Sequence, residues 1–147
     1  MKDIAEIMDA HQVEYEIIRH EIPLETARQG AEYLGIEIGQ TAPTLIVKTD
    51  KGYYALLLSG DRGRVQLEEL KPLLQTEQVK LAKPREVEQA VGCPIGCVPL
   101  LNPGLPTVFD RGLLRFPHIY GGTGRPGETL KIRPQDAERL NTVAAYL

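Results

Sequence analysis

The sequence lacks a long apolar run and has few cysteines and a single serine, and each shortage argues against a class of protein. No segment approaches the roughly 18–20 consecutive apolar residues of a membrane span. The first ten residues, MKDIAEIMDA, also lack the apolar centre of a signal peptide. We therefore expect a cytoplasmic protein with no membrane partner. The net charge of −3 at pH 7 argues against a surface that wraps DNA, although a pocket could still take the tip of an RNA.

The scarce reactive side chains show no spacing typical of metal binding or nucleophilic catalysis. Cys93 and Cys97 are the only cysteines, and a structural zinc needs about four ligands, so we interpret them as small, partly buried side chains. The chain has three histidines: His11, His20 and His118. None has an HxxxH-type neighbour, so we expect surface or hydrogen-bonded side chains. Ser59 lies outside any GxSxG motif, which argues against a serine triad.

Residues 122–127 satisfy the letters of the dinucleotide motif GxGxxG without its structural context. That motif requires a strand that turns into a helix, whereas Pro126 intervenes here and a strand is expected next. A phosphate loop is also unfavourable, because Glu128 stands where that motif needs lysine and would repel phosphates. We interpret the glycines as a turn with flexible backbone close to a ligand.

The segment TAPTLIVKTDKGYYALLLSGDR, residues 41–62, predicts a β-hairpin at the centre of a sheet. Its arms, residues 45–47 and 53–58, are apolar nearly throughout, which is the pattern of strands covered on both faces. Asp50 is a good turn opener, and Gly52 supplies a position with positive φ. Helices or further strands must therefore cover both faces of this hairpin.

The spacing of apolar residues in the rest of the chain predicts the helices and strands that cover the hairpin. We expect helices over residues 2–12, over residues 26–34 with Thr26 as N-cap, over the leucines of 67–74, from Pro84 to Gly92, and from Pro134 through Val143 and Ala144. We expect short strands over residues 13–18, 79–81, 98–101, 107–109, 118–120 and 128–133. The mixture indicates an α+β fold: one domain over residues 1–147, with a curved, mixed and partly barrel-like sheet. Residues 92–127 are rich in glycine and proline, and such loops on a rigid sheet often carry sites.

Several stretches together resemble one family. They are Glu25-Thr26 before a short helix ending in Leu34-Gly35, the hairpin TLIVKTDKGYYALLLSGDR, the stretch VKLAKPREVEQAVGCPIG, the strand LPTVFD, and YGGTGRPGETLKIRPQD. Their order and spacing over about residues 15–140 resemble the YbaK family. These are stand-alone aminoacyl-tRNA deacylases related to the editing domain inserted in bacterial prolyl-tRNA synthetases.

The resemblance implies a mixed α/β fold and hydrolysis of the ester that joins a wrong amino acid to tRNA, without a metal or organic cofactor. A second pocket is useful because small apolar side chains are discriminated by only about 10–200-fold in one binding step. The implied partner is the aminoacylated 3′ end of tRNA, and a homodimer or a synthetase partner stays open. In the family a lysine at the entry to the first hairpin strand and backbone amides of glycine-rich loops position the substrate, and water attacks.

The chain departs from the family at that lysine. Pro43 occupies its position before Thr44-Leu45, and proline offers neither a charge nor an N–H. Lys48 follows five residues later, which in a strand is roughly 16 Å away and on the opposite face. We therefore interpret Lys48 as a surface lysine, and the sequence identifies no catalytic side chain.

The glycine loops differ as well, and they complete the set of candidate residues. The family's GxxxP pattern would begin at Gly96, but the proline comes one place early, at Pro99, and Gly121 and Gly122 stand where relatives often carry serine. Arg125 or Lys131 could replace the missing charge. The candidate substrate-binding residues are Thr26, Thr44, Gly92, Gly96, Pro99, His118, Gly121, Gly122 and Arg125.

Two functions follow from these observations. The first is a trans-editing deacylase that acts on a mischarged tRNA carrying a small amino acid, and the retained glycine loops favour it. The second is a non-catalytic member of the same fold that binds an amino acid, a nucleotide end or a protein partner, and Pro43 favours that alternative.

Overall fold

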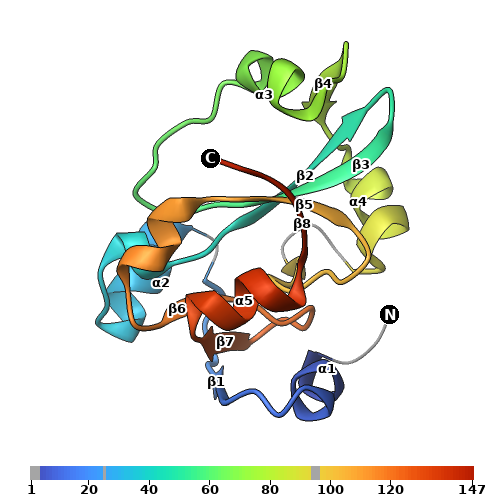
Figure 1. Ribbon diagram of the computed structural model, residues 1–147. Helices are drawn as coiled ribbons and strands as arrows, with labels where there is room; N and C mark the ends of the chain where they lie inside the picture. The colour runs from blue at the N-terminus through green and yellow to red at the C-terminus, as the bar shows by residue number, and fades with distance from the viewer. Residues whose placement is uncertain (1–3, 25, 94–96) are drawn as a thin grey trace.

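The computed structural model describes residues 4–24, 26–93 and 97–147, which fold into helices around two sheets (Figure 1). The α-helices are α1 (Ile4–Ala10), α2 (Ala27–Leu34), α3 (Leu67–Leu74), α4 (Pro84–Val91) and α5 (Pro134–Leu140), and the 3-10 helices are η1 (Ile38–Gln40) and η3 (Arg111–Arg115). The strands are β1 (Tyr15–Arg19), β2 (Thr44–Thr49), β3 (Gly52–Leu57), β4 (Val79–Leu81), β5 (Pro106–Phe109), β6 (Ile119–Gly122), β7 (Glu128–Ile132) and β8 (Thr142–Tyr146). None of the helices in these ranges is long and apolar enough to cross a membrane.

The larger sheet is mixed and has the strand order β4-β2-β3-β5-β8. Its β3-β5 and β5-β8 pairs are parallel and its other pairs antiparallel, whereas the smaller sheet, β1-β7-β6, is antiparallel throughout. Figure 1 shows α3 on one side of the larger sheet, and the smaller sheet with α1 and α5 on the other. The α+β prediction is confirmed, and neither sheet closes on itself within the described residues.

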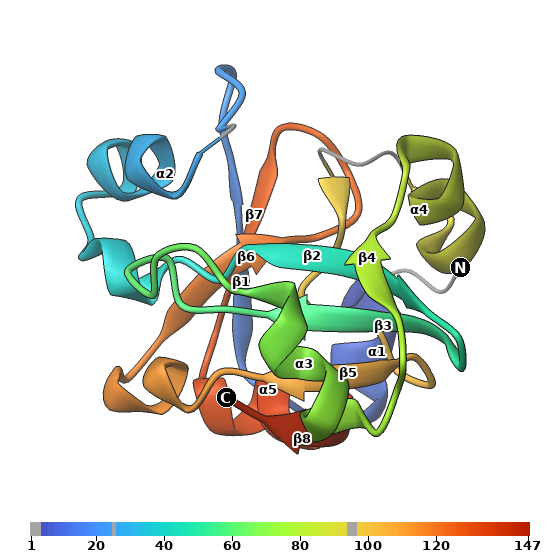
Figure 2. The ribbon, with the colours of Figure 1, turned by 90° about the horizontal axis from the view of Figure 1, so that it is seen from above.

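The predicted hairpin is confirmed, and its strands β2 and β3 lie inside the larger sheet. Successive residues of a strand point to opposite faces. Accordingly, Ile46 and Ala55 pack in a cluster with side chains of α4, while Val47 and Leu56 pack in another with side chains of α3. Figure 2 shows these helices beside the hairpin strands. The unbroken apolar pattern of the arms follows from this double cover.

Cap residues set the ends of the helix that borders the cavity described below. The Thr26 hydroxyl accepts a hydrogen bond from the Gln29 amide at 3.0 Å, and Gly35 ends α2 with a φ of 68°. The Thr26 cap and the end of this helix at Leu34-Gly35 are both as expected. Thr26 therefore marks the point at which the chain enters α2, and it is one of the residues that line that cavity.

Two element predictions are wrong. Residues 98–101 form no strand, because Pro99 lacks an N–H and the segment makes only isolated bonds such as that from Leu100 N to Gly122 O at 3.0 Å. Val143 and Ala144 belong to β8 instead of the last helix, which ends at Leu140. Parallel pairing with β5 outweighs the helical spacing of these small apolar residues.

A buried ion pair joins the chain after β3 to the end of β5. The Asp110 side chain is 1% exposed and accepts hydrogen bonds from Arg62 Nε at 2.7 Å, from Arg62 Nη2 at 3.0 Å and from the Ser59 amide at 2.9 Å. Burial alone would raise the pKa of Asp110, but the Arg62 guanidinium and the backbone amides of Ser59 and Gly112 lower it overall. The Ser59 hydroxyl in turn donates to the Gly39 carbonyl at 2.7 Å, which fixes η1 just before β2.

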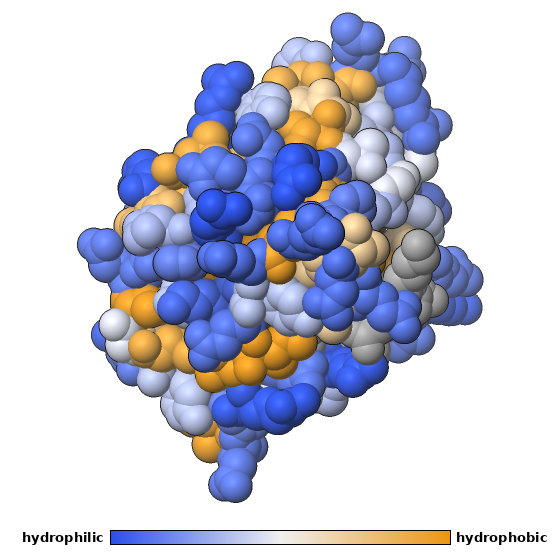
Figure 3. Space-filling model, turned by 60° about the horizontal axis from the view of Figure 1, so that its bottom comes forward, coloured by the Kyte–Doolittle hydropathy of each residue, from blue (hydrophilic) through white to orange (hydrophobic). Residues whose placement is uncertain are grey.

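The outer surface carries both hydrophilic and apolar side chains. Figure 3, which brings the side of the smaller sheet forward, shows mostly hydrophilic side chains interrupted by apolar patches. Such interruption is ordinary, because apolar atoms contribute more than half of a folded protein's accessible surface.

Candidate functional site

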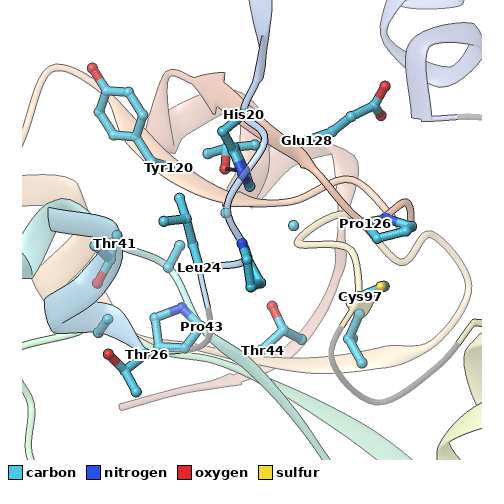
Figure 4. Close-up of a pocket in the computed structure, with 18 of the residues that line it drawn as sticks. His20, Leu24, Thr26, Thr41, Pro43, Thr44, Cys97, Tyr120, Pro126 and Glu128 are labelled. Atoms are coloured by element: carbon cyan, nitrogen blue, oxygen red, sulfur yellow. Dashed lines mark hydrogen bonds between the residues drawn. The ribbon is translucent and has the colours of Figure 1, made fainter. Parts of the chain in front are cut away.

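A cavity of about 580 Å³ lies where the two sheets meet (Figure 4). The junction is made by the chain before β2, because the Ala42 amide donates to the Tyr120 carbonyl of β6 at 2.7 Å. Residues from four parts of the chain, 20–34, 41–45, 97–98 and 120–129, line the cavity. Its walls are therefore assembled by tertiary contacts between distant segments.

The structure brings six of the residues singled out from the sequence to this cavity: Thr26, Pro43, Thr44, Gly121, Gly122 and Arg125. Four others lie elsewhere, as does Lys48, which is described below. Gly92 ends α4 with a φ of 77°, and Pro99 lines a separate cavity of about 360 Å³ beside α1. The backbone carbonyl of His118 accepts from Gln40 Nε2 at 3.2 Å, and Lys131 Nζ lies 4.0 Å from Glu16 Oε1. Gly96 lies outside the described residues.

Pro43 and Thr44 form the cavity wall at the start of the hairpin. The Pro43 carbonyl accepts from the Leu58 amide at 3.0 Å, so the backbone here is held by the sheet although proline donates nothing. Thr44 Oγ1 is buried and has no hydrogen-bond partner among the described residues. Since a buried hydroxyl without a partner is costly, this atom could pair with a bound ligand.

Lys48 lies outside the cavity and is engaged with α4. Its Nζ lies 2.9 Å from Glu86 Oε2, and its side chain is 45% exposed. The hydrogen bond from Lys48, together with one from the Lys83 amide, lowers the pKa of Glu86 from 4.5 to about 2, and the same contact raises the pKa of Lys48. In this geometry Lys48 contributes to the surface of the hairpin.

Gly121 and Gly122 leave part of the wall as bare backbone because their neighbours are too close for a side chain. A Cβ on Gly121 would lie 2.5 Å from Leu100 Cδ2, and one on Gly122 would lie 2.3 Å from the Val98 carbonyl oxygen. Residues 98–100 thus press against β6. A serine at Gly121 would have no room unless this segment moves.

The cavity also contains a histidine that the sequence analysis did not single out as a functional residue. His20 follows β1, and Thr129 lies in the neighbouring strand β7; both line the cavity. His20 Nδ1 lies 2.6 Å from the Ile22 carbonyl oxygen, and His20 Nε2 lies 3.1 Å from Thr129 Oγ1. The pair is 109 residues apart in the chain, so no local motif reveals it.

Two further ionisable groups shape the same cavity. Glu128 lies at its edge, 13% exposed, accepts from the Thr123 hydroxyl at 3.1 Å and lies 3.6 Å from Arg19 Nε. Cys97 lines it as a free thiol, whereas Cys93 is buried and burial raises the pKa of its thiol. Within the described ranges, no three His, Cys, Asp or Glu side chains are grouped so that they could hold a metal ion.

The family model described as aminoacyl-tRNA editing domain matches residues 21–140. Proline–tRNA ligases of Thermosipho melanesiensis and Desulforamulus reducens are 31% and 36% identical over 109 and 112 residues, which is 74% and 75% of this chain. The chain spans only 19% and 20% of the length of those two ligases.

Solved structures match nearly the whole chain. The hypothetical protein APE2540 has a TM-score of 0.88 at 28% identity, with 99% of this chain and 97% of that chain covered. A candidate trans-editing enzyme for prolyl tRNA synthetase has a TM-score of 0.82 at 27% identity, with 97% and 90% covered. The order of the strands, the cavity at their junction and these matches lead to one conclusion: the chain belongs to the aminoacyl-tRNA editing domain family.

Proposed function

We propose that this protein hydrolyses the ester of a mischarged tRNA that carries a small amino acid, acting in trans on the aminoacylated 3′ end. The observation that carries the proposal is the cavity beside Pro43 and Thr44, at the entry to the first hairpin strand, in a chain of the editing-domain family. Because the chain resembles YbaK proteins, which position their substrate at the entry to this strand, we expect the ester to bind beside Pro43 and Thr44.

The size and lining of the cavity support a small apolar amino acid as the group removed. Ligand sites usually measure about 300–1,000 Å³, and this cavity is within that range. Leu24, Leu45 and Val98 supply apolar surface for a side chain. A larger side chain would compete with the terminal nucleoside for the same volume.

Polar groups around the apolar lining support binding of the ester and the nucleoside. Thr44 Oγ1 would form a hydrogen bond with the substrate. The guanidinium of Arg125 would interact with a phosphate of the nucleoside end through its positive charge. Thr26, an exposed residue of the lining, could contact a ribose hydroxyl. These groups replace the positioning that the family obtains from the lysine absent at Pro43.

The proposal is tested by a panel of labelled aminoacyl-tRNAs: alanyl-, cysteinyl-, seryl- and threonyl-tRNA, each on its cognate tRNA and on prolyl tRNA. Loss of label well above the buffer rate from one or two members would support a deacylase and identify its substrate. Rates equal to buffer across the panel, with the protein folded by circular dichroism, would contradict it.

A second candidate, a non-catalytic binding module, is favoured by one observation: Pro43 removes the family's cationic anchor. The variant Pro43→Lys separates the two. Weak activity in the parent that rises with the lysine indicates a site that lost its chemistry. Strong parental activity that falls on the same substitution indicates a site rebuilt around proline.

A further inference from the structure

The cavity holds one histidine, His20, among the described residues that line it (Figure 4). Its two ring nitrogens have different partners. A backbone carbonyl can only accept, so the 2.6 Å contact with Ile22 O requires the proton on His20 Nδ1. In the neutral ring, Nε2 then carries a lone pair directed at Thr129 Oγ1, 3.1 Å away. The hydroxyl of Thr129 donates to it.

The surrounding structure holds this ring in place. Strands β1 and β7 pair with Ile18 opposite Thr129, so the end of β1 lies beside the start of β7. The His20 amide then donates a hydrogen bond to the Gly127 carbonyl at 3.0 Å. The ring of Tyr33 on α2 packs edge-on against His20, with centroids 5.7 Å apart. Thr129 is only 8% exposed, so the pair needs little reorganisation to exchange a proton.

The described residues that line the cavity include five ionisable side chains: His20, Cys97, Tyr120, Arg125 and Glu128. An arginine cannot accept a proton, and thiols and phenols are ordinarily protonated at neutral pH. The carboxylate of Glu128 is engaged by Thr123 and Arg19. Histidine is the side chain that ordinarily gains and loses a proton near neutral pH, so His20 is the base that this cavity offers.

We propose that His20, acting through Thr129, is the general base of ester hydrolysis in this cavity, a role that rests on the deacylase function proposed above. A water molecule donates a proton to Thr129 Oγ1 while the Thr129 hydroxyl passes its own proton to His20 Nε2. The water oxygen bonds to the carbonyl carbon of the ester. When the tetrahedral intermediate collapses, the bond to the ribose oxygen breaks, and that oxygen takes the proton back from the imidazolium through Thr129.

The test compares single-turnover deacylation by the parent and by His20→Asn across pH 5 to 9. Asparagine keeps an N–H for the Ile22 carbonyl but provides no base. General base catalysis contributes about 100-fold or more, so kcat should fall by that factor with little change in KM. The parental rate should rise with pH as the imidazole loses its proton, because only the neutral ring can act as the base. In the variant this rise should disappear and leave only the hydroxide-dependent slope. Tyr33, which packs against the ring, and Arg125 and Glu128, which line the same cavity, are unchanged in this variant.

Companion variants separate the relay from a structural effect. Thr129→Ser keeps the hydroxyl and should retain activity, whereas Thr129→Val keeps the shape, removes the hydroxyl and should lose activity as His20→Asn does. His11→Gln, on the chain after α1 and outside this cavity, is the matched control and should match the parent. Thermal unfolding of each variant shows whether the fold is retained.

The outcomes distinguish this role from the function itself. An active parent whose His20→Asn variant keeps the same rate and pH profile contradicts the role of His20 and leaves the deacylase standing. A variant that changes KM alone also contradicts it, since the ring would then only position the substrate. A parent inert toward the whole panel contradicts the deacylase and this role together.

Discussion

Replacing Gly122 with alanine tests whether the bare backbone wall of the cavity is a requirement of packing. The new Cβ would lie 2.3 Å from the Val98 carbonyl oxygen. This is roughly 1 Å short of an ordinary C···O contact of about 3.3 Å, so backbone must move. Overpacking of this kind costs about 1–3 kcal/mol of unfolding free energy. Alanine also lowers the conformational entropy of the unfolded chain, which offsets less than about 1 kcal/mol of that cost. At about 2–4 °C per kcal/mol for a chain of this size, the melting temperature should fall by several degrees.

The assays are thermal unfolding and urea unfolding, both followed by circular dichroism, with Gly30→Ala as the matched control. Gly30 lines the same cavity from inside α2, but its Cβ would meet only Thr41 Cγ2, at an ordinary 3.9 Å. Alanine in a helix interior is favoured by about 0.5–1 kcal/mol, so this variant should be as stable as the parent or more stable. If Gly122→Ala unfolds at the parental urea concentration, residues 98–100 do not press on β6 as described.

Three other variants test the account away from the reaction. Lys48→Ala should leave deacylation unchanged and return the pKa of Glu86 from about 2 toward 4.5 in an NMR titration, and a loss of activity would place the lysine in the reaction. Asp110→Asn should cost about 3 kcal/mol of unfolding free energy, the low end for a broken buried pair because Arg62 is 33% exposed. The folded pKa of Asp110 is lowered, so its stabilisation is complete well above pH 3.8 and is lost as pH falls below that value; the parent should therefore lose its advantage over this variant in acid. Asn141→Ala should lower the melting temperature, because the side chain bonds the buried backbone of residues 100–102, and each unsatisfied group costs about 1–3 kcal/mol. An unchanged melting temperature would count against that anchor.

The hairpin and the caps of α2 could be predicted because their causes are local. An apolar run of six residues, a turn glycine and a capping threonine each act over a few positions, and the structure uses them as expected. The last strand could not be predicted in this way. Val143 and Ala144 fit a helix equally well, and only the parallel pairing of β8 with β5, a strand far away in the sequence, places them in a strand.

In the candidate site, too, features that depend on neighbouring residues in the sequence could be predicted, whereas contacts between distant segments could not. The Pro43-Thr44 pair and the two glycines of β6 could be placed near a cavity, because a resemblance in sequence located them beside the hairpin. His20 could not, since its pairing with Thr129 depends on the register between β1 and β7. Pro99 follows the cavity-lining residue Val98 in sequence, but it lines the separate cavity beside α1. Sequence spacing alone does not reveal this difference.

The central claim is that this cavity hydrolyses an aminoacyl ester, and one measurement addresses it most directly. Single-turnover loss of label from the panel is followed for the parent and for Ala27→Phe, which adds a large ring at a residue that lines the cavity. The account predicts hydrolysis of a tRNA carrying a small amino acid by the parent, and the buffer rate for the folded variant. Equal hydrolysis by both proteins, or none by the parent, would contradict it.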